Sequence, residues 1–152
     1  MIADRAAARR LALQAMYQLD VQGQDYLISG LQESIAEATE DPRVREMAYF
    51  MAKSAWGFRE TADQWLTRLA AKWSVQRMAM VDRAILRLSV WEVVNYSSTP
   101  PLVVLNEAIN MAKEFSTADS GTFINGVLDT MIKEHLAATG RTLDGKGPAE
   151  KE

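Results

Sequence analysis

Residues able to carry chemistry are few in this sequence. Cysteine is absent, so neither a disulfide nor a thiolate metal site can form. The single histidine, His135, lies near the end of a predicted helix, where histidine usually complements the helix dipole. No P-loop, GxGxxG, GxSxG or HExxH pattern is present, and carboxylate pairs such as Glu33/Glu37 have the spacing of any solvated helix face. The sequence therefore predicts no catalytic residue, no metal and no cofactor, and an enzyme is the weaker class of function.

A more informative group of residues surrounds the polar connector 116–119, between two predicted helices. Phe115, Lys113, Asp119 and Phe123 bracket a helix N-terminus, whose free N–H groups favour an anion such as phosphate. Aromatic rings beside such a site could stack on unpaired RNA bases. The alternative is structural: both phenylalanines belong to the core, and Asp119 caps the helix or complements its dipole. Composition alone favours that structural alternative.

A second candidate group lies near the N-terminus, in a predicted helix over residues 4–21. Arg5 and Arg9 are one helical step apart, and Arg10 precedes Tyr17 by two turns, so guanidinium and phenol can share a face. Cations are unfavourable at the start of a helix because of its dipole. A phosphate contact would explain them, although on sequence alone a solvated basic turn is the favoured interpretation.

Length and composition bound the elements that position these groups. The chain has 152 residues and a formal net charge of −3, which predicts one domain and excludes a broadly basic nucleic-acid binder. No leader-like or membrane-spanning apolar run is present, so we expect a cytoplasmic protein that does not enter a membrane. We expect the domain over residues 1–139, followed by a disordered tail at 140–152, which has few apolar groups.

Helical periodicity extends over most of the chain. Before the connector it predicts helices at 4–21, weakly at 26–39, from Asp41-Pro42 onward, from a capping box at Thr61–Gln64, and at 74–95. The fourth of these should bury Trp65, Leu66, Leu69, Ala70 and Trp73. The helix at 74–95 is apolar on most sides, so we expect its neighbours to surround it.

Two further helices flank the connector, one opened by Pro100-Pro101 and one capped by Ser116 with Asp119. Gly126 lies inside the second, and we interpret it as a close helix–helix approach with no room for a side chain. No segment shows convincing strand alternation. The fold class predicted is therefore all-α, a compact bundle of about seven helices.

Three sequence blocks carry a resemblance to a known family. They are RRLALQAMYQLD near the N-terminus, VDRAILRLSVWEVV in the central predicted helix and NEAINMAKEFSTADSGTFINGVLD around the connector. In this order and at these separations they resemble the NusB family of transcription antitermination factors, over most of residues 5–135. The resemblance implies an all-helical fold and no catalysis. It also implies binding to boxA leader RNA of ribosomal RNA operons, together with the ribosomal protein that acts as NusE. This pair would join an RNA polymerase elongation complex with other Nus factors.

Motif positions also imply site residues. The family's RNA-binding surface would map onto Arg5, Arg9, Arg10, Tyr17, Lys113, Asp119 and Phe123. The side facing NusE would include Asp82, Arg83 and Arg87. The arginine run is interrupted by Ala6–Ala8, which implies weaker RNA binding by the protein alone. If Arg9 and Arg10 contact RNA, reversing their charges should weaken boxA binding and leave thermal melting unchanged.

Other interpretations remain open at this point. A NusB-like module also occurs in certain ribosomal RNA cytosine methyltransferases, but this sequence contains no methyltransferase domain. A protein-interaction adaptor without its own RNA specificity fits the acidic charge and sparse arginines. An exposed apolar face could serve a homodimer or the NusE contact.

Overall fold

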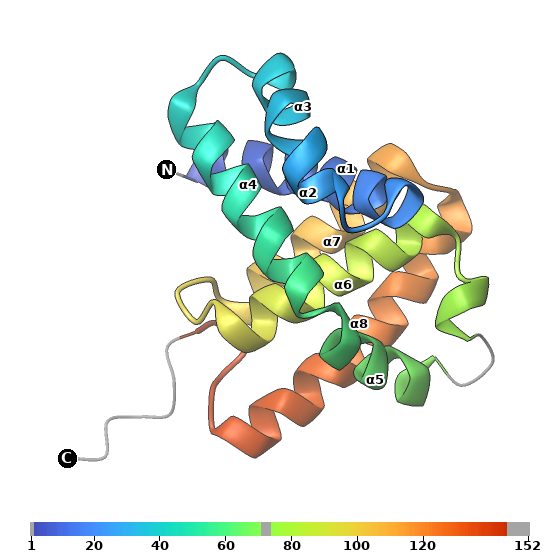
Figure 1. The fold of residues 1–152 in the computed structure, drawn as a ribbon. Helices are drawn as coiled ribbons and strands as arrows, with labels where there is room; N and C mark the ends of the chain where they lie inside the picture. Colours follow the sequence, from blue (N-terminus) through green and yellow to red (C-terminus); the bar gives the residue numbers. More distant parts are fainter. Residues whose placement is uncertain (1, 71–73, 146–152) are drawn as a thin grey trace.

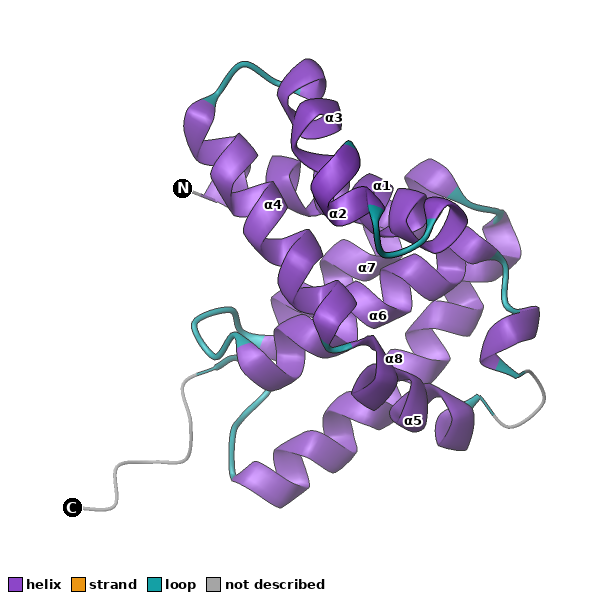
Figure 2. Cartoon of the chain, in the orientation of Figure 1, coloured by secondary structure: helices purple, strands orange, loops and turns teal. Residues whose placement is uncertain are grey.

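The computed structural model describes residues 2–70 and 74–145. Within these ranges the chain forms eight α-helices and one 3-10 turn, with no strand, which confirms the predicted all-α class (Figure 2). The helices are α1 (Ile2–Gln22), α2 (Tyr26–Ser29), α3 (Leu31–Ala38), α4 (Pro42–Gly57), α5 (Arg59–Leu69), α6 (Met80–Asn95), α7 (Pro101–Phe115) and α8 (Ala118–Thr139), with the 3-10 turn η1 at Val75–Arg77. No described helix combines the length and the apolar stretch needed to span a bilayer.

Helix α6 lies at the centre of the bundle, as its apolar sequence predicts. Helices α1, α4, α5, α7 and α8 all contact it (Figure 1). Every residue from Ala84 to Val93 is buried. A helix surrounded on all sides must be apolar around most of its circumference. The polar residues within that run therefore need partners inside the bundle.

The start of α6 differs from the prediction of one helix from Ser74. The chain forms η1 and then an extended segment at Met78 and Ala79, so that α6 begins at Met80. Val75 and Met78 are both buried, and the carbonyl of Val75 accepts a 3.1 Å hydrogen bond from Arg83 Nη1. Packing of this turn thus overrides local helix propensity. The predicted buried position Trp73 lies outside the described residues.

The sequence also predicted two helix starts upstream of α6, of which one is confirmed and one is wrong. At Asp41 the predicted cap is confirmed, since its Oδ1 accepts a 2.9 Å bond from the backbone N–H of Arg43. The capping box predicted at Thr61–Gln64 is wrong, because α5 already begins at Arg59, two residues after α4 ends. The weak pattern at 26–39 divides at Gly30, where a Cβ would lie 2.6 Å from the Tyr26 ring.

Part of the predicted tail is placed against the bundle. The backbone N–H of Leu102 donates to the carbonyl of Leu143 at 3.0 Å, and Arg141 Nη1 donates to the carbonyl of Val93 at 2.6 Å. Residues up to Gly145 therefore lie beside the α6–α7 connection. The prediction of disorder for 146–152 concerns residues outside the described ranges.

The interpretation of Gly126 as a close helix–helix approach is wrong. This glycine is exposed on α8, and a Cβ built on it would meet no neighbouring atom within 4 Å. The sequence period placed Gly126 inside a helix correctly but gave no information about which face is free.

Replacing Gly126 with alanine should therefore stabilise the protein. Alanine is favoured over glycine in a helix interior by about 1 kcal/mol, and nothing here opposes the added methyl group. Chemical denaturation should show a raised midpoint. Gly140→Ala is the matched control and should destabilise, because Gly140 ends α8 with a φ of +77°. A lower midpoint for Gly126→Ala would contradict the exposed position.

Candidate nucleic-acid interface

Arg9 is buried rather than exposed on α1. Its side chain pairs with Glu92 of α6, with Nε to Oε1 at 2.8 Å and Nη2 to Oε2 at 2.6 Å, and only 4% of the residue is exposed. Burial alone would lower the pKa of Arg9, but its hydrogen bond and its attraction to Glu92 raise that pKa above the ordinary value. The expectation that Arg9 contacts phosphate is corrected, since its donors face the bundle interior.

The other two arginines of α1 lie at the surface in different settings. Arg10 forms a two-pronged pair with Glu114 of α7, at 2.9–3.0 Å, and approaches Glu107 at 3.4 Å. The hydrogen bonds from Arg10 lower the pKa of Glu114. Arg5 lies over the Tyr96 ring at 5.8 Å from its centroid. Arg5 can therefore reach an added phosphate without first leaving a carboxylate among the described residues.

The connector between α7 and α8 is held by one buried carboxylate. Asp82 of α6 accepts hydrogen bonds from Ser116 Oγ at 2.8 Å and Ser120 Oγ at 2.9 Å, and the two hydroxyls lie 2.8 Å apart. Helix α8 therefore begins after Thr117, with no side-chain cap. The predicted capping role of Ser116 is wrong, because its hydroxyl is turned toward α6 instead.

Two hollows open on the surface around this connector. The first, of about 300 Å³, is lined by Tyr17, Phe115 and apolar residues of α1 and α6. The second, of about 320 Å³, is lined by Asp119, Phe123 and Arg77 of η1, above Asp82. Tyr17 and Phe123 are half-buried, and Phe115 is exposed. The structural alternative, in which both phenylalanines belong to the core, therefore does not hold for Phe115.

Lys113 completes this group from the last turn of α7. It is exposed and forms no ion pair with any described residue. We call Tyr17, Arg77, Lys113, Asp119 and Phe123, with Phe115, the connector surface. Arg77 was missed by the sequence reasoning because η1 was assigned to a long helix, where its position next to Phe123 could not be seen.

The three residues predicted to face NusE form hydrogen bonds or ion pairs within the bundle. Asp82 and Arg87 are buried, and Arg83 is largely so. Arg83 pairs with Asp20 at 2.7 Å, and Arg87 pairs with Asp63 at 2.7 Å. Carboxylates of α1 and α5 thus cover the two arginines, and the assignment of these three residues to NusE stays a prediction. Asp82 also lines a surface hollow.

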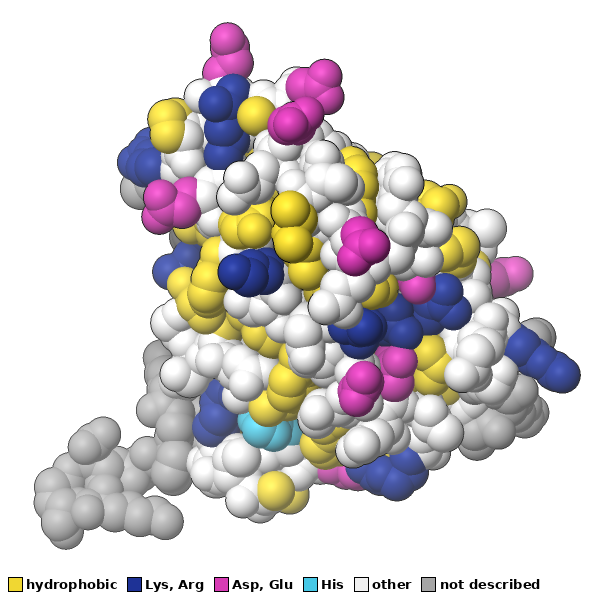
Figure 3. Space-filling model, viewed as in Figure 1, with side chains coloured by type: hydrophobic (Ala, Val, Ile, Leu, Met, Phe, Trp, Pro, Cys, Tyr) yellow, Lys and Arg dark blue, Asp and Glu magenta, His cyan; other side chains and the backbone are white. Residues whose placement is uncertain are grey.

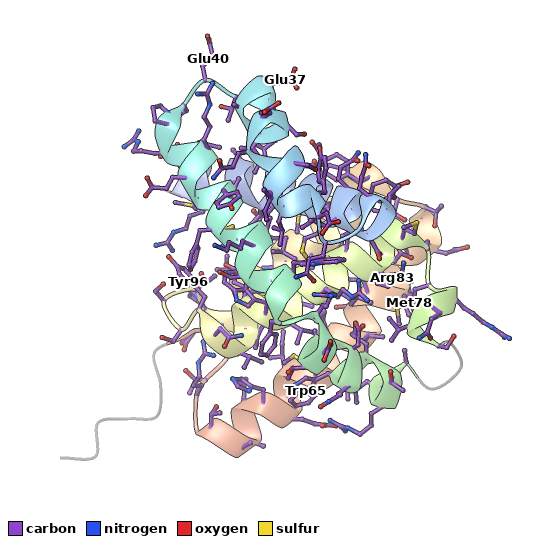
Figure 4. All side chains as sticks on the ribbon, viewed as in Figure 1. Glu37, Glu40, Trp65, Met78, Arg83 and Tyr96 are labelled. Atoms are coloured by element: carbon purple, nitrogen blue, oxygen red, sulfur yellow. The ribbon has the colours of Figure 1, made fainter. Side chains whose placement is uncertain are left out.

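Figure 4 labels side chains at both ends of α6. Arg83 and Met78 lie near its beginning, and Tyr96 follows its end. On the face seen in Figure 3, dark blue and magenta side chains adjoin in a few places, among mostly white and yellow atoms. This face therefore carries no broad positive field. Binding of phosphate would depend on the cations that form no ion pair with a described residue, such as Lys113.

Other candidate chemistry is weak in the described part of the chain. No group of three or more acidic or histidine side chains there could hold a metal ion. His135 is half-buried, and burial followed by the charge of Arg141 lowers its pKa. It lies 3.5 Å from Arg141 Nη1, which fits a structural role near the end of α8.

The fold and this surface define an all-α protein that presents aromatic rings around a helix N-terminus, with cations that form no ion pair to a described residue. Comparison with known proteins agrees with that class. The model of the NusB family matches residues 6–133. Transcription antitermination protein NusB of Symbiobacterium thermophilum is 40% identical over 143 residues, covering 90% of this chain and 94% of the relative. Its counterpart in Desulforapulum autotrophicum is 39% identical, covering 83% and 89%.

Solved structures give the same result. NusB of T. maritima superposes with a TM-score of 0.74 at 30% identity, covering 86% of this chain and 91% of that one. A crystal structure of the antitermination factors NusB and NusE in complex with dsRNA matches with a TM-score of 0.79 at 26% identity, covering 88% and 99%. The chain belongs to the NusB family.

Proposed function

We propose that this protein is a transcription antitermination factor that binds boxA leader RNA together with NusE. It acts in the cytoplasm, within an RNA polymerase elongation complex that contains other Nus factors, and it catalyses no reaction. The names of its relatives support this function, as does its similarity to NusB in complex with NusE and RNA. The single structural observation that carries the proposal is the connector surface, where rings and unpaired cations lie around the start of α8.

The connector surface offers distinct contacts to a single strand. Tyr17 and Phe123 supply faces on which bases can stack. Lys113 and Arg77 supply cations for phosphates, and the carboxylate of Asp119 can accept bonds from base amino groups. Arg5 and Arg10 offer further cations along α1, whereas Arg9 joins α1 to α6 through Glu92. Asp82, Arg83 and Arg87 remain the residues proposed to lie toward NusE, with Arg83 and Arg87 held by Asp20 and Asp63.

The competing function is a protein adaptor without RNA specificity. It is favoured by the ion pairing of Arg9, Arg10, Arg83 and Arg87, which leaves few cations for phosphate. Titration of boxA RNA and a scrambled RNA, with and without NusE, at two salt concentrations separates the two functions. Antitermination predicts boxA-selective binding that NusE strengthens. Binding of NusE with no RNA preference would establish the adaptor instead.

Lys113→Gln should weaken boxA binding and reduce its salt dependence. Removing one phosphate contact lowers the slope of log affinity against log salt by about 1. Lys133→Gln is the matched control, because Lys133 is equally exposed but lies on α8 in an ion pair with Asp129. Fluorescence anisotropy over a salt series measures both slopes. Equal slopes for Lys113→Gln and the wild type would remove Lys113 from the interface.

A further inference from the structure

A second group of aromatic rings lies at the other end of α6, with Phe50 exposed, Tyr96 half-buried and Trp91 buried, and the proposed function has not used it. Phe50 of α4, Trp91 of α6 and Tyr96 line an open groove of about 290 Å³, with Ser54 and Asn95 at its rim. We call this the aromatic groove. We propose that it binds an unpaired base of the RNA strand that the connector surface also contacts, so the proposal rests on the proposed function.

Phe50 supplies the exposed ring of the aromatic groove, and Trp91 and Tyr96 support it. Trp91 and Tyr96 stack, with centroids 6.1 Å apart, and Phe50 meets Trp91 edge-on at 5.9 Å. Phe50 is 49% exposed, whereas its neighbour Met51, which points in another direction on α4, is buried. A large exposed ring next to two fixed rings is a platform on which a base can stack, with no sequence preference required.

Polar atoms at the rim suit a base rather than an apolar side chain. The side chain of Asn95 is exposed, and its Nδ2 donates to the carbonyl of Trp91 at 3.2 Å, which leaves its Oδ1 free to accept a bond. Ser54 Oγ also lines the groove. An amide oxygen and a hydroxyl beside stacked rings can bond the edge of a flat heterocycle.

Two cations flank the groove without a carboxylate partner among the described residues. Arg5 lies over Tyr96 at 5.8 Å, and Lys53 lies over Tyr49 at 5.9 Å, one turn along α4 from the groove. Most other surface arginines of α1 and α6 are paired with carboxylates, as Arg10 is with Glu114. The nearest acidic side chain on α4, Glu46, lines the adjacent hollow instead. The charge here therefore complements a phosphate backbone.

The position of the groove also connects it with the RNA surface. Arg5, which lies over Tyr96, and Tyr17 are twelve residues apart on α1, a separation of roughly 18 Å along the axis of that helix. A single strand of several nucleotides can span this length, within the site sizes typical of such proteins. Figure 3 shows apolar side chains gathered on the face where α4 lies.

The test places 2-aminopurine, a base whose fluorescence falls on stacking, at each position of boxA RNA and of four flanking nucleotides on either side. Wild type, Phe50→Ala, Phe50→Leu and the control Ile28→Ala are compared; Ile28 is 94% exposed on α2. We expect one position to be quenched by the wild type and by Ile28→Ala, but not by Phe50→Ala. Affinity for that RNA should fall about fivefold for Phe50→Ala, the loss of one stacked base.

Phe50→Leu keeps the apolar bulk of the side chain but loses the flat ring. It should therefore recover any stability that Phe50→Ala loses, but it should not recover the quenching. Quenching that is identical in all four proteins, with equal affinity, would overturn the proposal. A loss of NusE binding by Phe50→Ala, with RNA quenching unchanged, would assign the groove to a protein and overturn it as well. Failure of the wild type to bind boxA RNA at all would contradict the proposed function first, and this proposal with it.

Discussion

Arg9→Ala should lower the free energy of unfolding by about 3–5 kcal/mol, the cost of leaving a buried charge without its partner. Glu92 is 1% exposed and lies in the most buried helix of the bundle, where water cannot replace the guanidinium. Urea denaturation measures the change. The prediction that reversing Arg9 and Arg10 leaves melting unchanged is therefore abandoned, because it assumed that both side chains were exposed.

Two further variants isolate the cause of this loss. Arg10→Ala breaks a more exposed pair and should change stability by less than about 1 kcal/mol. The double variant Arg9→Met, Glu92→Leu should recover most of the stability, since replacing a whole buried pair with apolar groups is often neutral. If Arg9→Ala unfolds at the same urea concentration as the wild type, Arg9 is not held by Glu92 and returns to the candidate RNA contacts.

Asp82→Ala should weaken RNA binding through the connector rather than by a lost contact. Ser116 and Ser120 lose their common acceptor, which costs about 1–3 kcal/mol of stability for buried polar groups. The connector then becomes free to move, and Phe115 and Asp119 move with it. Ordering each such side chain again costs about 0.5–1.5 kcal/mol, so we expect roughly tenfold weaker boxA binding.

Asp82→Asn is the matched control for the connector. Its amide can accept from one serine and donate to the other, so the connector should stay in place and binding should remain near that of the wild type. Equal losses for the asparagine and alanine variants would show that the charge of Asp82 acts on the ligand directly. No loss for either would separate the connector from RNA binding.

Periodicity alone predicted the class of fold and the central place of α6. The stripe of Ala8, Ala12, Ala15 and Leu19 on α1 is buried as its spacing indicates. Spacing of this kind reports which face of a helix is apolar. It does not report what covers a face. For this reason Gly126 was predicted to pack against another helix, although no neighbouring atom lies within contact distance of a Cβ at this position.

The ion pairs show where single-sequence reasoning ends. Glu92 within a long apolar run was a usable signal, because a carboxylate in a surrounded helix needs a cation. Its partner Arg9 is 83 residues away, and no local pattern connects the two. Arg9 and Arg10 are adjacent in sequence, yet one is buried and one lies at the surface. Successive side chains on a helix point in different directions, and only tertiary packing decides which of the two faces the bundle.

The most direct test of the central claim is transcription through a terminator placed downstream of a boxA leader. RNA polymerase, NusE and the other Nus factors are present throughout, and this protein is added or withheld. We expect read-through to rise when the protein is added to the boxA template and to stay unchanged on a template with a scrambled boxA. Read-through that is the same with and without the protein on the boxA template would contradict an antitermination function.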